Sequence, residues 1–158
     1  MAEDLIIIKT ENKEQQYKSL VPQIEALLYG EEDMIANLAN IAAALKEQFG
    51  WLWIGFYMVK GEELVLGPFQ GPVACTRIKK GKGVCGKAWE DAKAIIVEDV
   101  ELFPGHIACS SASRSEIVLP VFKNGEVAAV LDADSAELSA FDKTDEQYLQ
   151  QIISLLTL

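Results

Sequence analysis

The sequence has few basic residues, a single histidine and no long apolar run. It holds 14 lysines and arginines against 24 aspartates and glutamates, which gives a formal net charge of −10. This balance argues against a nucleic-acid partner, whose phosphates need a basic face, and against an anionic membrane surface. No apolar stretch approaches the roughly 20 residues that a transmembrane helix needs.

The N-terminus also lacks the pattern of a secretory signal. Glu3 and Asp4 stand where a signal carries basic residues, and the apolar run that follows covers only residues 5–8. We therefore expect a cytoplasmic protein. Its three cysteines are an odd number, and the cytosol is reducing, so a structural disulfide framework is not expected.

What the chain does contain is enough apolar material for one core. Half of its 158 residues are apolar, and its mass is 17.4 kDa. This is the size of one domain, so we expect a single domain over residues 1–158. Residues 1–10 form an N-terminal extension whose structure the pattern does not specify.

Two kinds of hydrophobic spacing divide the chain. Helical spacing covers residues 10–29, where Pro22 is a possible kink, residues 31–49, and residues 141–158, where Asp142 is a plausible N-cap. Strand-like spacing covers 51–60, 64–69, 94–97, 116–122 and 126–134, with a short helix expected over 84–91. Asn124-Gly125 predicts a tight turn between the last two strands.

These elements predict an α+β fold with a central antiparallel sheet of about six strands. The two N-terminal helices and the C-terminal helix should cover one face of the sheet. The glycine-rich stretch 71–86 and the irregular stretch 100–114 should then lie over the other face. Loops above a rigid sheet are where a ligand pocket usually forms.

The first strand should separate an aromatic face from a core face. Alternation places Trp51, Trp53, Gly55 and Tyr57 on one side and Leu52, Ile54, Phe56 and Met58 on the other. The second set is expected to pack on the helices. Trp53 and Tyr57 would face the loops, either as ordinary packing or as the side of a pocket for an apolar or onium-like group.

Two carboxylates share one face of the last strand. Asp132 and Asp134 point the same way by alternation, and Glu116 opens the partner strand. One interpretation places the pair at a solvated strand end. The other has the three carboxylates meet a cationic group such as an amine, with at least one pKa raised in the manner of a proton donor.

The three cysteines, Cys75, Cys85 and Cys109, all fall in the loop stretches. Buried packing and zinc binding are the alternatives to redox chemistry. The chain has no Cys-x-x-Cys, and its one histidine is His106, so the spacing does not match a structural zinc site. We expect no resident metal and favour thiol redox chemistry, because loops can bring two thiols together.

Several motifs resemble the free methionine-(R)-sulfoxide reductases, a family built on a GAF domain. The resemblance runs from about residue 12 to the C-terminus and includes all three cysteines. The motifs are Trp53-Ile54-Gly55-Phe56-Tyr57, Leu66-Gly67-Pro68-Phe69-Gln70-Gly71, Ala74-Cys75, Gly81-Lys82-Gly83-Val84-Cys85-Gly86, His106-Ile107-Ala108-Cys109, Ser113-Arg114-Ser115-Glu116-Ile117-Val118 and Leu131-Asp132-Ala133-Asp134-Ser135.

The resemblance implies an oxidoreductase that reduces the R-epimer of free methionine sulfoxide. In such a mechanism Cys109 attacks the sulfoxide, methionine leaves, and the resulting sulfenic acid condenses with a resolving cysteine. Cys75 is the main candidate for that role and Cys85 is the alternative. Thioredoxin, kept reduced with electrons from NADPH, would reduce the disulfide. No bound cofactor is expected.

The same resemblance suggests how the substrate binds. Glu116, Asp132 and Asp134 would hold its ammonium, and Trp53 and Tyr57 would contact its S-methyl group. The main alternative is a GAF-type sensor that binds a small ligand, or switches its thiols, without catalysis. Whether the chain is a monomer or a homodimer stays open.

Overall fold

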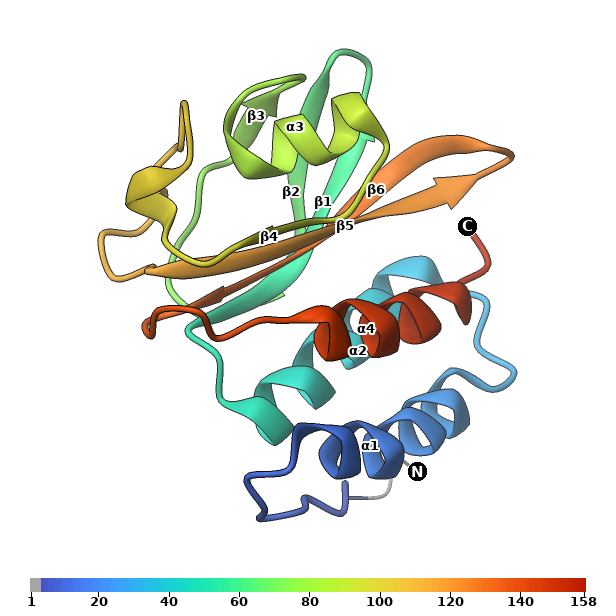
Figure 1. Cartoon of the computed structure of the whole chain (residues 1–158). Coiled ribbons are helices and arrows are strands. Elements are labelled where there is room, and N and C mark those ends of the chain that lie inside the picture. Colours follow the sequence, from blue (N-terminus) through green and yellow to red (C-terminus); the bar gives the residue numbers. More distant parts are fainter. Residues whose placement is uncertain (1–3) are drawn as a thin grey trace.

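The computed structural model describes residues 4–158, which fold around a six-stranded antiparallel sheet (Figure 1). The strand order is β3-β2-β1-β6-β5-β4, so the N-terminal strand β1 and the late strand β6 are neighbours at the centre. The strands are β1 (Trp53–Lys60), β2 (Glu63–Gln70), β3 (Arg77–Lys79), β4 (Ile95–Val97), β5 (Ser115–Lys123) and β6 (Glu126–Ser135). The predicted antiparallel α+β sheet is confirmed, and β3 is a strand that the sequence pattern did not indicate.

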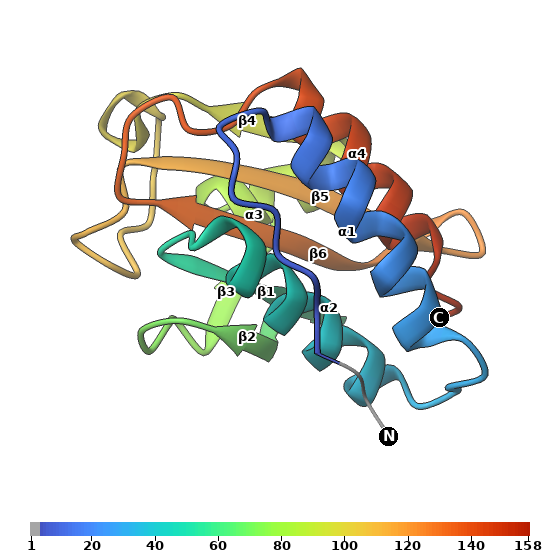
Figure 2. The ribbon, with the colours of Figure 1, turned by 90° about the horizontal axis from the view of Figure 1, so that it is seen from below.

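Three helices cover one face of the sheet, as predicted. They are α1 (Lys13–Leu28), α2 (Met34–Phe49) and α4 (Lys143–Ser154), with α1 lying outside α2 and α4 (Figures 1 and 2). Asp142 is the N-cap of α4, and its carboxylate accepts from the backbone N–H groups of Thr144 and Asp145. Helix α1 continues through Pro22. None of the described helices is long and apolar enough to cross a membrane.

The segment before α1 lies along this helical layer (Figure 2). The side-chain amide of Gln23 pairs with the backbone of Ile6, and that of Gln48 pairs with the backbone of Ile8. Because both amides accept and donate, they satisfy the extended backbone of this segment.

The opposite face is covered by α3 (Gly83–Asp91), the short helix η1 (Val100–Leu102) and the connecting loops. Cys85 therefore lies on a helix, which corrects the expectation that all three cysteines occupy loops. Gly86 permits the close packing of α3, because a Cβ at this position would lie 2.5 Å from the carbonyl oxygen of Lys79 in β3.

Side-chain alternation divides the interior into two apolar clusters, one on each face of the sheet. Ile54 and Phe56 pack on the helices, whereas Trp53 and Tyr57 face α3 and the loops. The predicted faces are wrong for the two residues before Trp53, because β1 begins there. Trp51 stacks on Phe49 and meets Phe141 on the helical side, and Leu52 lies on the other side.

The hairpin between β5 and β6 turns at Asn124 and Gly125, as predicted. Their φ angles of 52° and 80° are the positive values that a primed turn requires. The turn fixes the register of the long pair, in which Glu116 stands opposite Asp134. The same end of β6 pairs with β1, so the acidic and aromatic positions of the sequence meet on adjacent strands.

Candidate functional site

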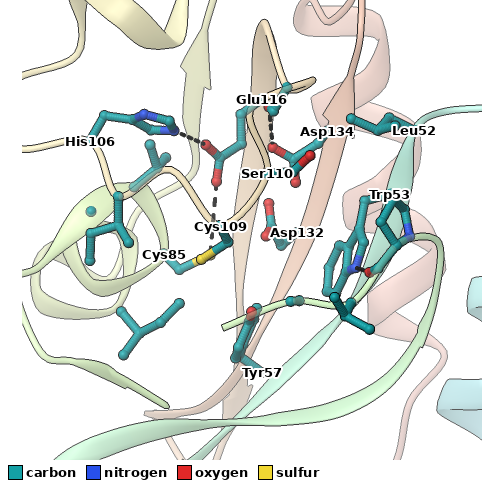
Figure 3. Close-up of a pocket in the computed structure, with 18 of the residues that line it drawn as sticks. Leu52, Trp53, Tyr57, Cys85, His106, Cys109, Ser110, Glu116, Asp132 and Asp134 are labelled. Atoms are coloured by element: carbon teal, nitrogen blue, oxygen red, sulfur yellow. Dashed lines mark hydrogen bonds and ion pairs between the residues drawn. The ribbon is translucent and has the colours of Figure 1, made fainter. Parts of the chain in front are cut away.

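A pocket opens on the face of the sheet that carries α3 (Figure 3). Its base is formed by β1, β5 and β6, and its sides are formed by residues 72–74, the start of α3 and residues 106–113. The lining residues are Leu52, Trp53, Tyr57, Pro72, Val73, Ala74, Ile78, Lys82, Gly83, Val84, Cys85, His106, Ile107, Cys109, Ser110, Ser113, Glu116, Asp132 and Asp134.

The carboxylate cluster Glu116, Asp132 and Asp134 lies at the base of this pocket. Glu116 and Asp132 are only 5% and 6% exposed, and Asp134 is half-buried, so the solvated strand-end interpretation of the aspartate pair does not describe Asp132. Asp132 pairs with Gly55 across β1 and β6. On its other side, Gly55 pairs with Phe69 of β2. A Cβ on Gly55 would lie 2.4 Å from the Cβ of Phe69, so glycine is required where β1 and β2 approach at this point.

Burial without positive partners controls the charge of the cluster. Among the residues that the structure describes, neither lysine nor arginine forms an ion pair with any of the three carboxylates. Burial raises the pKa of Asp132, and the charge of Asp134 raises it further. Burial, together with the charges of Asp132 and Asp134, likewise raises the pKa of Glu116.

Among the three carboxyls of the cluster, Asp134 has the pKa that is least raised above its ordinary value. Burial raises its pKa to about 6, and the hydroxyl of Ser113 opposes that rise by donating a hydrogen bond of 2.6 Å. Asp132 Oδ1 has no hydrogen-bond partner among the described residues, although it is buried. An orphaned buried acceptor costs about 1–3 kcal/mol, so a donor that entered the pocket would gain free energy by a hydrogen bond to this atom.

The cysteines are placed above this cluster. Cys75 and Cys109 form a disulfide that joins the two loops at the pocket, with their Cα atoms 5.4 Å apart. Cys109 lines the pocket, and Cys75 reaches it through this bond. Cys85 is a free and buried thiol whose Sγ lies 3.9 Å from Oε1 of Glu116.

The surroundings of Cys85 hold it as a neutral thiol. Burial raises its pKa well above the ordinary value, and the charges of Asp132 and Glu116 raise it further. A thiol in such surroundings is a poor source of thiolate. The nucleophile is therefore better sought in the Cys75–Cys109 pair, which is half-exposed at the pocket.

The aromatic residues form the opposite side of the pocket. The rings of Trp53 and Tyr57 are 5.8 Å apart, and both side chains are almost fully buried. Trp53 Nε1 donates to the carbonyl oxygen of Pro72, and the Tyr57 hydroxyl donates to that of Cys75. These hydrogen bonds hold the loop of residues 72–75 against the sheet.

Two further polar side chains belong to the site. In the sequence, Ser113 is indicated only within a motif shared with the reductase family, and His106 within another such motif and as a possible zinc ligand. In the fold, His106 Nε2 lies 3.8 Å from Oε2 of Glu116, and burial lowers the pKa of this histidine (Figure 3). The contacts of His106 with Glu116 and of Ser113 with Asp134 have no signal in the spacing, because both depend on the path of the loop before β5 across the sheet.

The arrangement combines three chemical capabilities. Buried carboxylates can hold a cation, a carboxyl with a raised pKa can donate a proton, and two cysteines can cycle between thiols and a disulfide. Seven of the eight side chains singled out from the sequence line one pocket, and the eighth, Cys75, is bonded to a lining residue.

Comparison with known proteins gives consistent relatives. Residues 30–158 match the family model of the GAF domain. The chain is 64% identical to GAF domain-containing protein A of Dictyostelium discoideum, with 99% of each chain covered. It is 45% identical to the free methionine-R-sulfoxide reductase of Escherichia coli, covering 92% of this chain and 88% of that protein.

Solved structures agree with these relatives. The free methionine-R-sulfoxide reductase of Neisseria meningitidis, determined in complex with its substrate, superposes with a TM-score of 0.95. It is 52% identical, and the match covers 98% of this chain and 93% of that one. With this agreement in sequence and fold, the chain belongs to the free methionine-R-sulfoxide reductases of the GAF domain family.

Proposed function

We propose that this chain reduces the R-epimer of free methionine sulfoxide to methionine. The observation that carries the proposal is the disulfide between Cys75 and Cys109, which adjoins a pocket whose base is a buried carboxylate cluster. The proposed redox-active cysteine pair thus lies beside the pocket whose carboxylates would bind a small cationic ligand. The relatives named for this activity support the same conclusion.

In the reduced enzyme, the thiolate of Cys109 attacks the sulfur of the sulfoxide. The sulfoxide oxygen passes to Cys109 as a sulfenic acid, the thioether of methionine leaves, and two electrons have moved from the enzyme to the substrate. The thiol of Cys75 then attacks the sulfenic sulfur, which releases water and forms the disulfide. A dithiol reductant of the thioredoxin class reduces this disulfide by thiol exchange and is itself oxidised.

The substrate is a free amino acid, and the pocket supplies a partner for its charged amine. The ammonium would donate to the carboxylate cluster, including the unpartnered Oδ1 of Asp132. The S-methyl group would contact Trp53 and Tyr57, whose rings form the apolar side of the pocket. The backbone N–H groups of Ala112 and Ser113 already donate to Ser110, so those of Ser110 and Ser111 are the candidates for the substrate carboxylate.

The oxygen of the sulfoxide needs a proton as the S–O bond breaks. Glu116 and Asp132 are the candidates for that general acid, because burial raises the pKa of each. A raised pKa lets a carboxyl keep its proton to a higher pH, so it can donate that proton to a sulfoxide oxygen within hydrogen-bond distance. Asp134, with a pKa of about 6, is the better anion for the ammonium.

The test is a coupled assay with free methionine-(R)-sulfoxide, thioredoxin, its reductase and NADPH. We expect consumption of one NADPH for each methionine formed, and little turnover of the S-epimer. The sensor alternative predicts binding without NADPH loss. An absence of turnover with both thioredoxin and dithiothreitol would contradict the proposed reaction, whereas turnover with dithiothreitol alone would contradict only the choice of reductant.

A further inference from the structure

Three buried polar side chains of the pocket, Cys85, Glu116 and Asp132, form a tight group of potential metal ligands. The Sγ atom of Cys85 and one carboxylate oxygen each of Glu116 and Asp132 all lie within 4.8 Å of one another. All three residues are buried. Figure 3 shows them converging from α3, β5 and β6, so each is held by a separate element of the fold.

In the structure without a ligand, this group presents ligand atoms that are weakly partnered or unpartnered. Asp132 Oδ1 lacks a hydrogen-bond partner among the described residues, and the Cys85 thiol makes a long, weak hydrogen bond of 3.9 Å with Glu116. His106 is close by, with Nε2 at 3.8 Å from the other oxygen of Glu116. A sulfur, two carboxylates and an adjacent imidazole make up a mixed donor set.

We propose that Cys85, Glu116 and Asp132 bind a soft divalent cation, Zn²⁺ as the type case, in the place of the substrate's ammonium. The thiolate excludes Mg²⁺ and Ca²⁺ as preferred occupants, because these ions select oxygen ligands in larger number. Zn²⁺ accepts four ligands drawn from sulfur, nitrogen and oxygen. On binding, the Cys85 thiol and any protonated carboxyl of Glu116 or Asp132 release their protons to solvent and become anionic ligands, with no change of oxidation state.

The geometry requires a small closure. Zinc bonds of about 2.0 Å to oxygen and about 2.3 Å to sulfur place tetrahedral ligands roughly 3.3–3.5 Å apart. The present separations, at most 4.8 Å, exceed these values by about 1.5 Å or less, which rotation of the side chains of Glu116 and Asp132 can supply. His106 or water completes the fourth position.

The cation and the substrate should exclude each other, since both use the Asp132 carboxylate. Metal binding would therefore hold the enzyme inactive while the redox pair itself remained untouched. The competition rests on the proposed function, but the existence of the metal site does not.

The disulfide form offers a clean test. In it Cys75 and Cys109 cannot ligate, so Cys85 is the only thiol available. We expect Co²⁺, added to the oxidised protein without reductant, to give a sulfur-to-cobalt charge-transfer band, and Zn²⁺ to displace it at one equivalent per chain. The band should be lost in Cys85→Ser. In Asp132→Asn, the affinity for Co²⁺, measured from the band, should fall at least ~10-fold.

Glu47→Gln, an exposed change on α2, is the matched control and should bind Co²⁺ as the wild type does. Near-ultraviolet circular dichroism would verify that the variants fold. If the wild type gives no charge-transfer band, or if the band persists in Cys85→Ser, the metal site is wrong.

A second arm adds methionine sulfoxide or glycine at equal concentration to the cobalt-loaded protein. Both amino acids chelate free metal alike, but only the first should fill the pocket, so it should remove cobalt at lower concentration. Equal displacement by the two would overturn the competition. A cobalt band in a protein that reduces no methionine sulfoxide would instead refute the proposed function and leave the metal site in place.

Discussion

The phenolic hydroxyl of Tyr57 donates a hydrogen bond of 2.9 Å to the backbone carbonyl oxygen of Cys75. Tyr57 lies on the central strand β1 and is 2% exposed, whereas Cys75 lies in the loop that follows β2. The hydrogen bond therefore ties one half of the redox pair to a central strand of the sheet. It holds Cys75 where Cys109 can reach it.

Replacing Tyr57 by Phe removes this hydrogen bond and keeps the ring. A neutral hydrogen bond contributes about 1 kcal/mol, so we expect disulfide formation after one turnover to slow by roughly 5-fold. The measurement is the loss of free thiols with time after substoichiometric methionine sulfoxide is added. Tyr148→Phe, which loses a 3.3 Å contact with Glu14 on the helical side, should leave the rate unchanged. An unaltered rate in Tyr57→Phe would show that the loop is held by other contacts.

The two members of the disulfide should have separable roles. Cys109→Ser should release no methionine even in a single turnover, because the nucleophile is lost. Cys75→Ser should release about one equivalent per enzyme and then stop as a sulfenic acid, since the first attack needs no resolving thiol. Chromatography of methionine after mixing without reductant measures both. One equivalent from Cys109→Ser would move the nucleophile to another cysteine.

The carboxylate cluster should make the enzyme selective for a free α-amine. N-acetylation removes the positive charge and leaves buried carboxylates without a partner. We expect a loss of about 2–5 kcal/mol, or ~30- to several-thousand-fold in kcat/KM. The comparison of kcat/KM on free and N-acetylated methionine-(R)-sulfoxide measures it. Equal values would remove the cluster from amine recognition.

Amide variants should divide the cluster by role. In Asp132→Asn, Asp134→Asn and Glu116→Gln the shape is kept and the charge is lost. The residue that binds the ammonium should show mainly a raised KM, and the general acid should show kcat lowered by roughly 10²- to 10⁴-fold. Steady-state kinetics of the three variants tests this division. Near-wild-type constants in all three would leave the cysteines as the site and discard the acidic cluster.

Asp134 should also affect stability in a defined pH window. Its pKa is about 6 in the fold against an ordinary 3.8. Below about pH 3 it is protonated in both the folded and unfolded states. Between about pH 4 and 6 it is ionised mainly in the unfolded state, and above pH 6 the fold also bears an ionised buried group. Stability of the wild type should therefore fall relative to Asp134→Asn as pH rises from 4 to 7, by roughly 1–3 kcal/mol. Urea unfolding at each pH measures the difference, and a constant difference would contradict it.

The sequence patterns were most informative where neighbouring residues decide the structure. Strand alternation placed Asp132 and Asp134 on the pocket face, and Asn124-Gly125 defined the hairpin. The alternation failed at Trp51, which packs with aromatic rings from α2 and the segment before α4. Such packing depends on partners distant in sequence, so the spacing of apolar residues along one strand cannot predict it.

The same reason explains what was missed in the site. Ser113 meets Asp134, and His106 meets Glu116, across a loop whose path is set by long-range contacts. Strand β3 has only three residues and exists because it pairs with β2. A segment this short has too few residues to show a period.

The Cys75–Cys109 disulfide closes a long loop of the chain. The two cysteines are 34 positions apart in sequence, and β3, α3 and β4 lie between them. Closing a loop of that length restricts the unfolded chain by about 4 kcal/mol on the chain-entropy model. The form of the enzyme that waits for reductant is thus the one most resistant to thermal unfolding and proteolysis. Oxidising conditions, under which reductant is scarce, would then prolong the lifetime of the protein while it is idle.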